Sequence, residues 1–305
     1  MKEQIGFRYC MSLAFDGTVR DHHYTLKCLP ESNLRQTITA LDVTLPPGDC
    51  HWESQDTFGN RELLGVLAKP HDSFYAEIAG AAVLTLGEKG TILRANPKHG
   101  GKEMILYPEE KVRSDKIGIF RYPTALTRPG SRIQEYWRCC AGEGTLSESI
   151  HFMDSVSSDP GEKSAEEEIR HRAGMAVHLM HCLHGDMTYR KEATDVHTTA
   201  EEAMEKGTGV CQDYAHIYVS LLRLAGIPAR YVTGMLRGEG ESHAWAEAAL
   251  GDYWYGLDPT NDCAAAGEHV KIGAGRDYND CRISQGVFYG KPGQHQDIQV
   301  SVQRL

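Results

Sequence analysis

The sequence contains no run of about 18 apolar residues, so no membrane-spanning helix is expected. Residues 1–17 carry charged side chains within every short apolar stretch and lack the continuous apolar region of a signal peptide. Internal repeats and low-complexity tracts are missing as well. From these absences we expect a cytoplasmic protein that does not act at a membrane.

Basic residues are outnumbered by acidic ones, 32 against 42, which gives a formal net charge of −10. Binding of nucleic-acid phosphates needs clustered Lys and Arg, so we expect no nucleic-acid partner. A calcium loop of the Asp-x-Asp-x-Asp-Gly kind is also missing, which argues against a calcium-activated enzyme. The nine cysteines are odd in number and scattered, which fits a reducing cytoplasm better than a disulfide framework.

The composition is that of a globular protein, with 41% hydrophobic and 24% charged residues. Residues 24–29 and 37–45 alternate with the period of half-buried strands, and turn clusters separate such segments. We therefore predict a β-rich N-terminal domain, residues 1–155, that resembles a sandwich and carries no catalytic group. The polar, turn-rich stretch 154–164 leads into a second domain, residues 156–305.

The second domain mixes helices and strands, so the chain is predicted to be α+β. Apolar residues recur with helical period over 164–184, and another helix is expected to begin at Cys211 and to end at Gly226 and Pro228. Strands are predicted over 230–233, 244–249, 253–257 and 297–303.

Cys211 is the first candidate for chemistry. Two glycines, Gly207 and Gly209, lead directly into the helix that it begins. A thiol at a helix N-terminus lies at the positive end of the helix dipole, which favours the nucleophilic thiolate. Taken alone, such a residue is more often a buried structural cysteine.

A nucleophile needs a base, and the base needs a group that orients it. His243 lies in a strand-like segment 32 residues after Cys211, and Asp258 closes the next strand 15 residues later. Adjacent antiparallel strands would place the carboxylate beside the imidazole. Each residue alone has an ordinary structural explanation, but the ordered set predicts a catalytic triad.

These motifs resemble those of the bacterial transglutaminase-like cysteine protease family, in the branch with an N-terminal β domain. The resemblance runs through residues 207–216, 221–232, 243–247 and 258–261, with weaker matches at 24–30, 56–60 and 275–280. It implies a papain-like transglutaminase core with Cys211 as nucleophile, His243 as general base and acid, and Asp258 as the orienting group. The backbone N–H of Cys211 would hold the oxyanion, supported by Tyr189 or Gln212 as candidates.

The function implied is a peptidase or amidase that cleaves a peptide or isopeptide amide through a thioester. Transfer of the acyl group from a glutamine side chain to an amine shares the same first step and stays open. A non-catalytic binding module is a minor alternative. The substrate is expected to be a peptide or protein, and the sequence leaves the oligomeric state open.

No cofactor and no metal site is expected. His171, His178 and Cys182 share one helical face and could clip a metal, but no fourth ligand with convincing spacing follows. The adjacent Cys139 and Cys140 are interpreted as packing residues.

Overall fold

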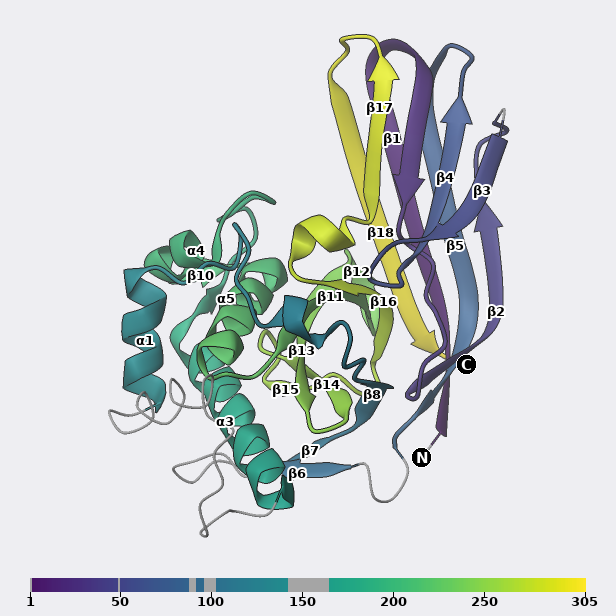
Figure 1. Ribbon diagram of the computed structural model, residues 1–305. Helices are drawn as coiled ribbons and strands as arrows, with labels where there is room; N and C mark the ends of the chain where they lie inside the picture. The colour runs from purple at the N-terminus through teal and green to yellow at the C-terminus, as the bar shows by residue number, and fades with distance from the viewer. Residues whose placement is uncertain (1, 49, 88–91, 96–102, 142–164) are drawn as a thin grey trace.

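The first strand, β1 (Lys2–Leu26), organises the β-rich part of the molecule. The computed structural model describes residues 2–48, 50–87, 92–95, 103–141 and 165–305 (Figure 1). Buried Ile5, Phe7 and Tyr9 alternate with more exposed residues in the period of a strand with one covered face. The register breaks between Ala14 and Val19, and Asp21 has a positive φ of 51°. At this bend the strand passes from one sheet into the other.

Each half of β1 has its own antiparallel partners. The first half pairs with β5 (His71–Thr85) and β18 (Gln294–Arg304). The second half pairs with β4 (Arg61–Leu67) and β17 (Ser284–Tyr289). Further strands extend these sheets: β2 (Gln36–Thr44) on β5, β3 (Cys50–Gln55) on β4 and β12 (Gly238–Gly240) on β18. The expected sandwich is therefore present, and its core holds apolar residues from both sheets.

The second group of elements is a mixed helix and strand unit. Its described residues form a six-stranded sheet in which β15 (Cys263–Ala264), β14 (Tyr253–Asp258), β13 (His243–Leu250), β11 (Ala229–Leu236) and β16 (His269–Gly275) lie in that order. The short strand β8 (Pro108–Lys111) pairs with β14. The predicted α+β class is confirmed.

Helices cover one face of this sheet (Figure 1). They are α1 (Ser131–Ala141), α3 (Ala165–Asp186), α4 (Ala200–Lys206) and α5 (Cys211–Leu224). Ala246, Ala248 and Leu250 pack against the helices, whereas the alternate residues Trp245 and Glu247 lie on the other face. That second face therefore carries the buried polar side chains of the core.

Helix α1 lies in the region that the sequence predicted to be β-rich. Ile133 and Trp137 are buried and lie four residues apart, so both point into the helical core. The spacing of these two residues was the available signal for this helix. Because α1 packs among α3, α4 and α5, it belongs with the second group of elements.

The two groups are not consecutive in sequence. The C-terminal strands β17 and β18 complete the sandwich, and Met235 and Val270 of the core sheet share its apolar cluster. The predicted boundary at residues 155 and 156 lies outside the described residues. In the described part of the chain, no helix is both long and apolar enough to cross a membrane.

Polar side chains from the sandwich loops fasten this part to the core sheet. Asn60 Nδ2 donates to the Ala274 carbonyl at 2.9 Å, and Asn60 Oδ1 accepts from the Ala274 N–H at 2.7 Å. Lys27 Nζ donates to Asp56 Oδ2 at 2.6 Å and to the Asp280 carbonyl at 3.0 Å. The segments 56–60 and 275–280, which are distant in sequence, therefore meet at one junction.

Short elements complete the description: β6 (Leu93–Ala95), β7 (Met104–Leu106), β9 (Thr188–Tyr189), β10 (Thr208–Gly209), η1 (Ile117–Phe120) and η2 (Tyr278–Cys281).

Candidate active site

Cys211 is the first residue of α5, as predicted. The entry into the helix is fixed by Asp213, whose Oδ2 accepts from the Val210 N–H at 2.8 Å and from Thr194 Oγ1 at 2.6 Å. A Cβ at Gly209 would lie 2.6 Å from that same oxygen, closer than packing allows. Only glycine at position 209 therefore lets the chain approach the Asp213 carboxylate and hold the thiol at the helix N-terminus.

His243 and Asp258 lie on the antiparallel strands β13 and β14, at the end of the sheet that faces Cys211. The His243 Nε2 and Asp258 Oδ2 atoms are 2.8 Å apart, and both side chains are buried. The His243 ring also hydrogen-bonds to the Cys211 thiol. Because Nε2 contacts Asp258, the other ring nitrogen, Nδ1, is the one left for the thiol. The structure thus brings the three sequence-predicted residues into one hydrogen-bonded chain.

Asp258 is held by more donors than His243 alone. Its Oδ2 also accepts from His269 Nε2 at 3.0 Å and from Asn261 Nδ2 at 2.7 Å. Its Oδ1 accepts from the backbone N–H groups of Thr260 at 3.0 Å and Asn261 at 3.3 Å. Burial opposes the charge, but the hydrogen bonds from the two histidines outweigh it and hold the pKa of Asp258 far below its usual range. The carboxylate therefore stays ionised at any working pH.

His243 has the opposite shift. Burial disfavours its protonated form, but the hydrogen bonds to Asp258 and Cys211 outweigh burial and raise the pKa of His243 to about 10. The ring is therefore an imidazolium at neutral pH. An adjacent imidazolium favours the thiolate form of a cysteine, so the site is arranged for nucleophilic attack.

His269 was not predicted from the sequence. It begins β16, pairs with Leu236 of β11, and reaches Asp258 only because the strands β14, β13, β11 and β16 bring their ends together. The signal available in the sequence was weak: a histidine 11 residues after Asp258, at the start of an alternating segment.

The ligand-type atoms of His243, Asp258 and His269 lie within 4.8 Å of one another. Each of these atoms already takes part in a short hydrogen bond, with both imidazoles against one carboxylate oxygen. The contacts are those of a hydrogen-bonded triad with an added histidine. On the helical face of His171, His178 and Cys182, which was not expected to bind a metal, Cys182 Sγ lies 3.6 Å from His178 Nε2, which also hydrogen-bonds to the Cys140 carbonyl.

The cleft at Cys211 has a volume of about 720 Å³. Tyr189 lines it and is 48% exposed, and Gln212 lines it while its Nε2 donates to the Val196 carbonyl at 3.4 Å. The first N–H groups of a helix have no acceptor in a preceding turn and can hold an anion. In α5 the Asp213 N–H already donates to the Val210 carbonyl at 2.9 Å, so the candidates are the N–H groups of Cys211 and Gln212. The oxyanion roles of Tyr189 and Gln212 stay predictions. The sandwich contributes Tyr9, Gln296 and Ile298 to the wall.

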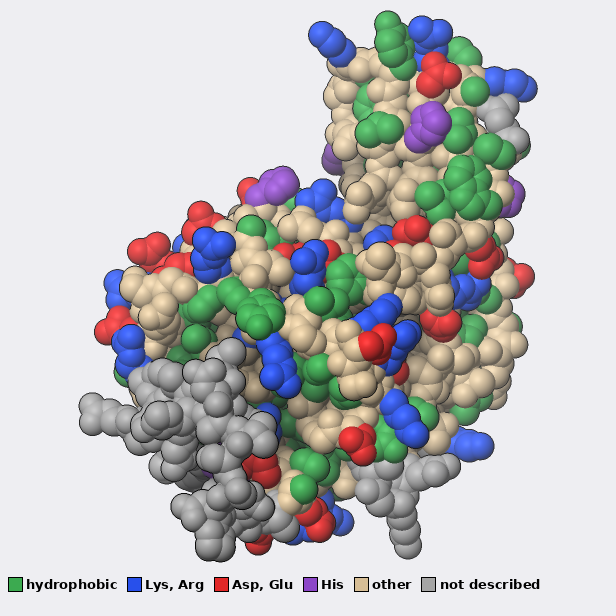
Figure 2. Space-filling view, in the orientation of Figure 1, with side chains coloured by type: hydrophobic (Ala, Val, Ile, Leu, Met, Phe, Trp, Pro, Cys, Tyr) green, Lys and Arg blue, Asp and Glu red, His purple; other side chains and the backbone are tan. Residues whose placement is uncertain are grey.

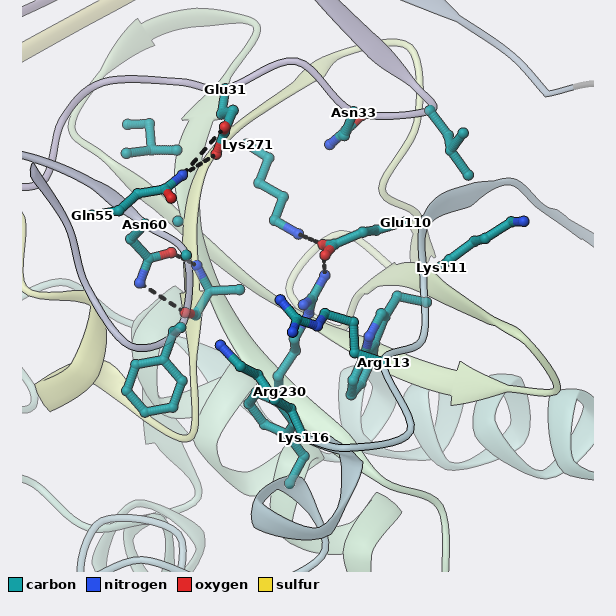
Figure 3. Close-up of a pocket in the computed structure, with 18 of the residues that line it drawn as sticks. Glu31, Asn33, Gln55, Asn60, Glu110, Lys111, Arg113, Lys116, Arg230 and Lys271 are labelled. Atoms are coloured by element: carbon teal, nitrogen blue, oxygen red, sulfur yellow. Dashed lines mark hydrogen bonds and ion pairs between the residues drawn. The ribbon is translucent and has the colours of Figure 1, made fainter.

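A second hollow of about 600 Å³ lies between the sandwich loops and the far face of the core sheet (Figure 3). Arg230 lies over the Trp254 ring at 4.4 Å and contacts Glu110 Oε2 at 2.7 Å, while Lys271 Nζ lies 3.7 Å from that same oxygen. Buried Glu247 forms ion pairs with both Arg230 and Lys271. The described residues lining this hollow include neither cysteine nor histidine. Arg230 and Lys271 are thus paired with carboxylates, whereas Lys111, Arg113 and Lys116 leave the lining with a positive balance.

Comparison with known proteins agrees with this geometry. The family model of the transglutaminase-like superfamily matches residues 161–259, which include Cys211, His243 and Asp258. An uncharacterized protein of Mycobacterium bovis is 34% identical over 292 residues, covering 90% of this chain and 83% of the relative. The chain belongs to the transglutaminase-like superfamily. The family membership predicted from the motifs is thereby confirmed.

Two further proteins match to different extents. An uncharacterized protein of Mycobacterium leprae is 37% identical over 129 residues, which cover 39% of this chain and 46% of that protein. A solved structure from Cytophaga hutchinsonii, described as a "Putative Cysteine Protease", has a TM-score of 0.68 at 16% identity. The match covers 100% of this chain and 91% of that one. It shows that the sandwich and the core occur together in a second protein of this fold.

Figure 2 shows acidic and basic side chains interspersed over the face in view. Around the Cys211 cleft the balance is acidic, with Glu192, Asp195, Glu239 and Glu241 in its lining against Lys191 and Arg237.

Proposed function

We propose that the protein is a cysteine-nucleophile acyl-transfer enzyme that hydrolyses peptide or isopeptide amides through a thioester. The observation that carries the proposal is the hydrogen-bonded chain of Cys211, His243 and Asp258 at the N-terminus of α5. In this chain the thiol is the nucleophile, the charged imidazole is its acid and base, and the buried carboxylate is the orienting group. A non-catalytic module would have no need to keep two buried charges beside a thiol.

In the first half-reaction the Cys211 thiolate attacks the amide carbon, and the carbonyl oxygen takes the negative charge. The N–H groups at the start of α5 stabilise that oxyanion. The His243 imidazolium then gives its proton to the departing nitrogen as the C–N bond breaks. The products are a free amine, a thioester on Cys211 and a neutral His243.

In the second half-reaction neutral His243 takes a proton from water as its oxygen attacks the thioester carbon. The C–S bond breaks, the carboxylic acid leaves, and Cys211 and His243 are again thiolate and imidazolium. Asp258 keeps the Nε2–H of His243 directed away from the thiol and stays charged throughout.

Amine transfer is the second candidate. An amine in place of water would attack the same thioester and give an amide. The acidic side chains in the cleft lining favour the approach of a protonated amine through electrostatic attraction. Hydrolysis is preferred because the Cytophaga hutchinsonii protein of the same fold is described as a "Putative Cysteine Protease".

The proposal includes a cytoplasmic location and a peptide or protein substrate. All nine cysteines lie in the described part of the chain and are free thiols, which supports a reducing compartment. We propose neither a nucleic-acid nor a membrane partner, in line with the net charge of −10.

The test is to trap the acyl-enzyme from a peptide library and to identify it by mass spectrometry, with and without cadaverine. A thioester on Cys211 that decays to the acid identifies a hydrolase, and conversion to a cadaverine amide identifies a transferase. Cys211→Ala should form no adduct, and Cys139→Ala, which removes an exposed thiol, is the matched control. Acylation that survives in Cys211→Ala would refute the proposal.

A further inference from the structure

A second histidine shares the oxygen by which Asp258 holds His243. Oδ2 of Asp258 lies 2.8 Å from Nε2 of His243 and 3.0 Å from Nε2 of His269. A triad requires only the first of these contacts. We propose that His269 is a positioning residue that fixes Asp258 and sets the pH range over which His243 and Cys211 remain an ion pair. This inference rests on the proposed function and assigns His269 a part in it.

The His269 ring is fixed from several sides. It is buried, and the Trp245 ring meets it edge to face with centroids 5.2 Å apart. Its carbonyl accepts from Arg35 Nη1 at 2.8 Å, and Arg35 is itself paired with buried Glu109. A ring held in this way presents its Nε2 to Asp258 in one orientation.

His269 acts as a neutral donor. Since ionised Asp258 can only accept, the His269 proton is on Nε2. Its Nδ1 is buried and has no hydrogen-bond partner within the described residues, so a second proton there would leave an uncompensated cation. Burial lowers the pKa of His269, and the hydrogen bond to Asp258 opposes this without overcoming it. The two histidines on one oxygen therefore differ in charge.

This arrangement limits how strongly Asp258 holds the His243 proton. Three side-chain donors, from His243, His269 and Asn261, share Oδ2. Each hydrogen bond weakens the attraction of the carboxylate for its other donors. Removing one donor therefore strengthens the hydrogen bonds that remain. Without His269, Asp258 should attract the His243 imidazolium more strongly.

The charged and titratable groups that face this cluster come from four elements or segments. They are Cys211 of α5, Cys263 of β15, Arg35 of the loop before β2, and Glu109 of β8. Arg35 and Glu109 form an ion pair in which burial raises the pKa of the Glu109 carboxyl. Both residues are unchanged in the His269 variants, so a difference between wild type and variant arises from His269 itself.

The experiment compares His269→Leu, which removes the donor at similar volume, with His269→Gln, which keeps an N–H in reach of Asp258. The pKa of His243 is read by nitrogen-15 NMR titration, and the pH dependence of Cys211 alkylation by iodoacetamide is read by mass spectrometry. In His269→Leu we expect the pKa of His243 to rise by about 0.5–1 unit. The imidazolium should therefore persist to higher pH, so the change in the Cys211 alkylation rate that accompanies its loss should move up in pH, and His269→Gln should restore both toward wild type.

The wild-type protein supplies a test that needs no variant. The His269 nitrogens should show the neutral Nε2–H form throughout pH 5–9, and a titration within that range would overturn the proposal. An unchanged or lowered pKa of His243 in His269→Leu would overturn it as well. Failure of Cys211 to react faster than Cys139 in the wild type would instead count against the proposed function, and the NMR result would still decide the role of His269.

Discussion

Replacement of Asp258 by asparagine should prevent His243 from acting as a base toward the Cys211 thiol. The backbone N–H groups of Thr260 and Asn261 donate to Oδ1, so the oxygen of the asparagine amide should occupy that position. The NH2 group then occupies the position of Oδ2 and faces three side chains that donate to it in the wild type, those of His243, His269 and Asn261. His243 would then have to accept at Nε2, which moves its proton to Nδ1, beside Cys211. In that tautomer the ring cannot take a proton from the thiol.

The size of the effect follows from the lost charge. A carboxylate in contact with an imidazole raises its pKa by about 1–3 units, so the pKa of His243 should fall from about 10 to roughly 8. With a fall of about 2 units, worth about 3 kcal/mol, the protonated fraction at pH 9 drops from about 0.9 to about 0.1. Because the imidazolium is then lost at a lower pH, the change in the Cys211 alkylation rate that accompanies its loss should move down in pH by about 2 units.

The assay is the rate of Cys211 alkylation by iodoacetamide from pH 4 to pH 10, together with NMR titration of His243. Asp262→Asn is the matched control, because it makes the same change four residues away at a residue that pairs with exposed His181. Its positive φ of 48° is also well tolerated by asparagine. Superimposable profiles for the wild type and Asp258→Asn would refute the role assigned to Asp258.

Three further predictions concern other parts of the molecule. Iodoacetamide at pH 7 should label Cys211 faster than Cys139, and equal rates by peptide mapping would contradict an ion-paired thiol. Gly209→Ala should destabilise the fold by about 1–3 kcal/mol because its methyl group would collide with Asp213. A melting temperature within about 1 °C of wild type would contradict this. The control is Gly240→Ala, because the Cβ position of Gly240 is open. Tyr189→Phe should lower kcat/KM by about tenfold or more if its hydroxyl donates to the oxyanion, whereas an unchanged value would reduce Tyr189 to a wall residue.

Local patterns predicted the triad because each of its members lies on an element with a strong signal of its own. Cys211 follows two glycines at a helix start, and Asp258 ends an alternating strand one hairpin after His243. The helix that begins at Cys211 ends at Leu224, close to the expected stop at Gly226. In this region sequence spacing and spatial contact coincide.

Contacts between distant segments could not be predicted in the same way. The strand predicted over 24–29 overlaps only the last three residues of β1, which begins at Lys2, ends at Leu26 and pairs with strands near the C-terminus. His269 reaches Asp258 through the order of strands β14, β13, β11 and β16, which no local pattern specifies. The predicted strand at 297–303 was confirmed as part of β18, but its partner could not be derived from alternation alone.

The pairing of β1 with β17 and β18 has a consequence for biosynthesis. A ribosome that adds roughly 5–20 residues per second needs about 10–40 s to proceed from β5 to the start of β18. During that time the first half of β1 has an open edge where β18 will later pair. The wall of the Cys211 cleft includes Tyr9 of β1 together with Gln296 and Ile298 of β18, so it is complete only after β18 has been synthesised. The nascent chain therefore carries the reactive cysteine for some time before β18 completes this wall of the cleft.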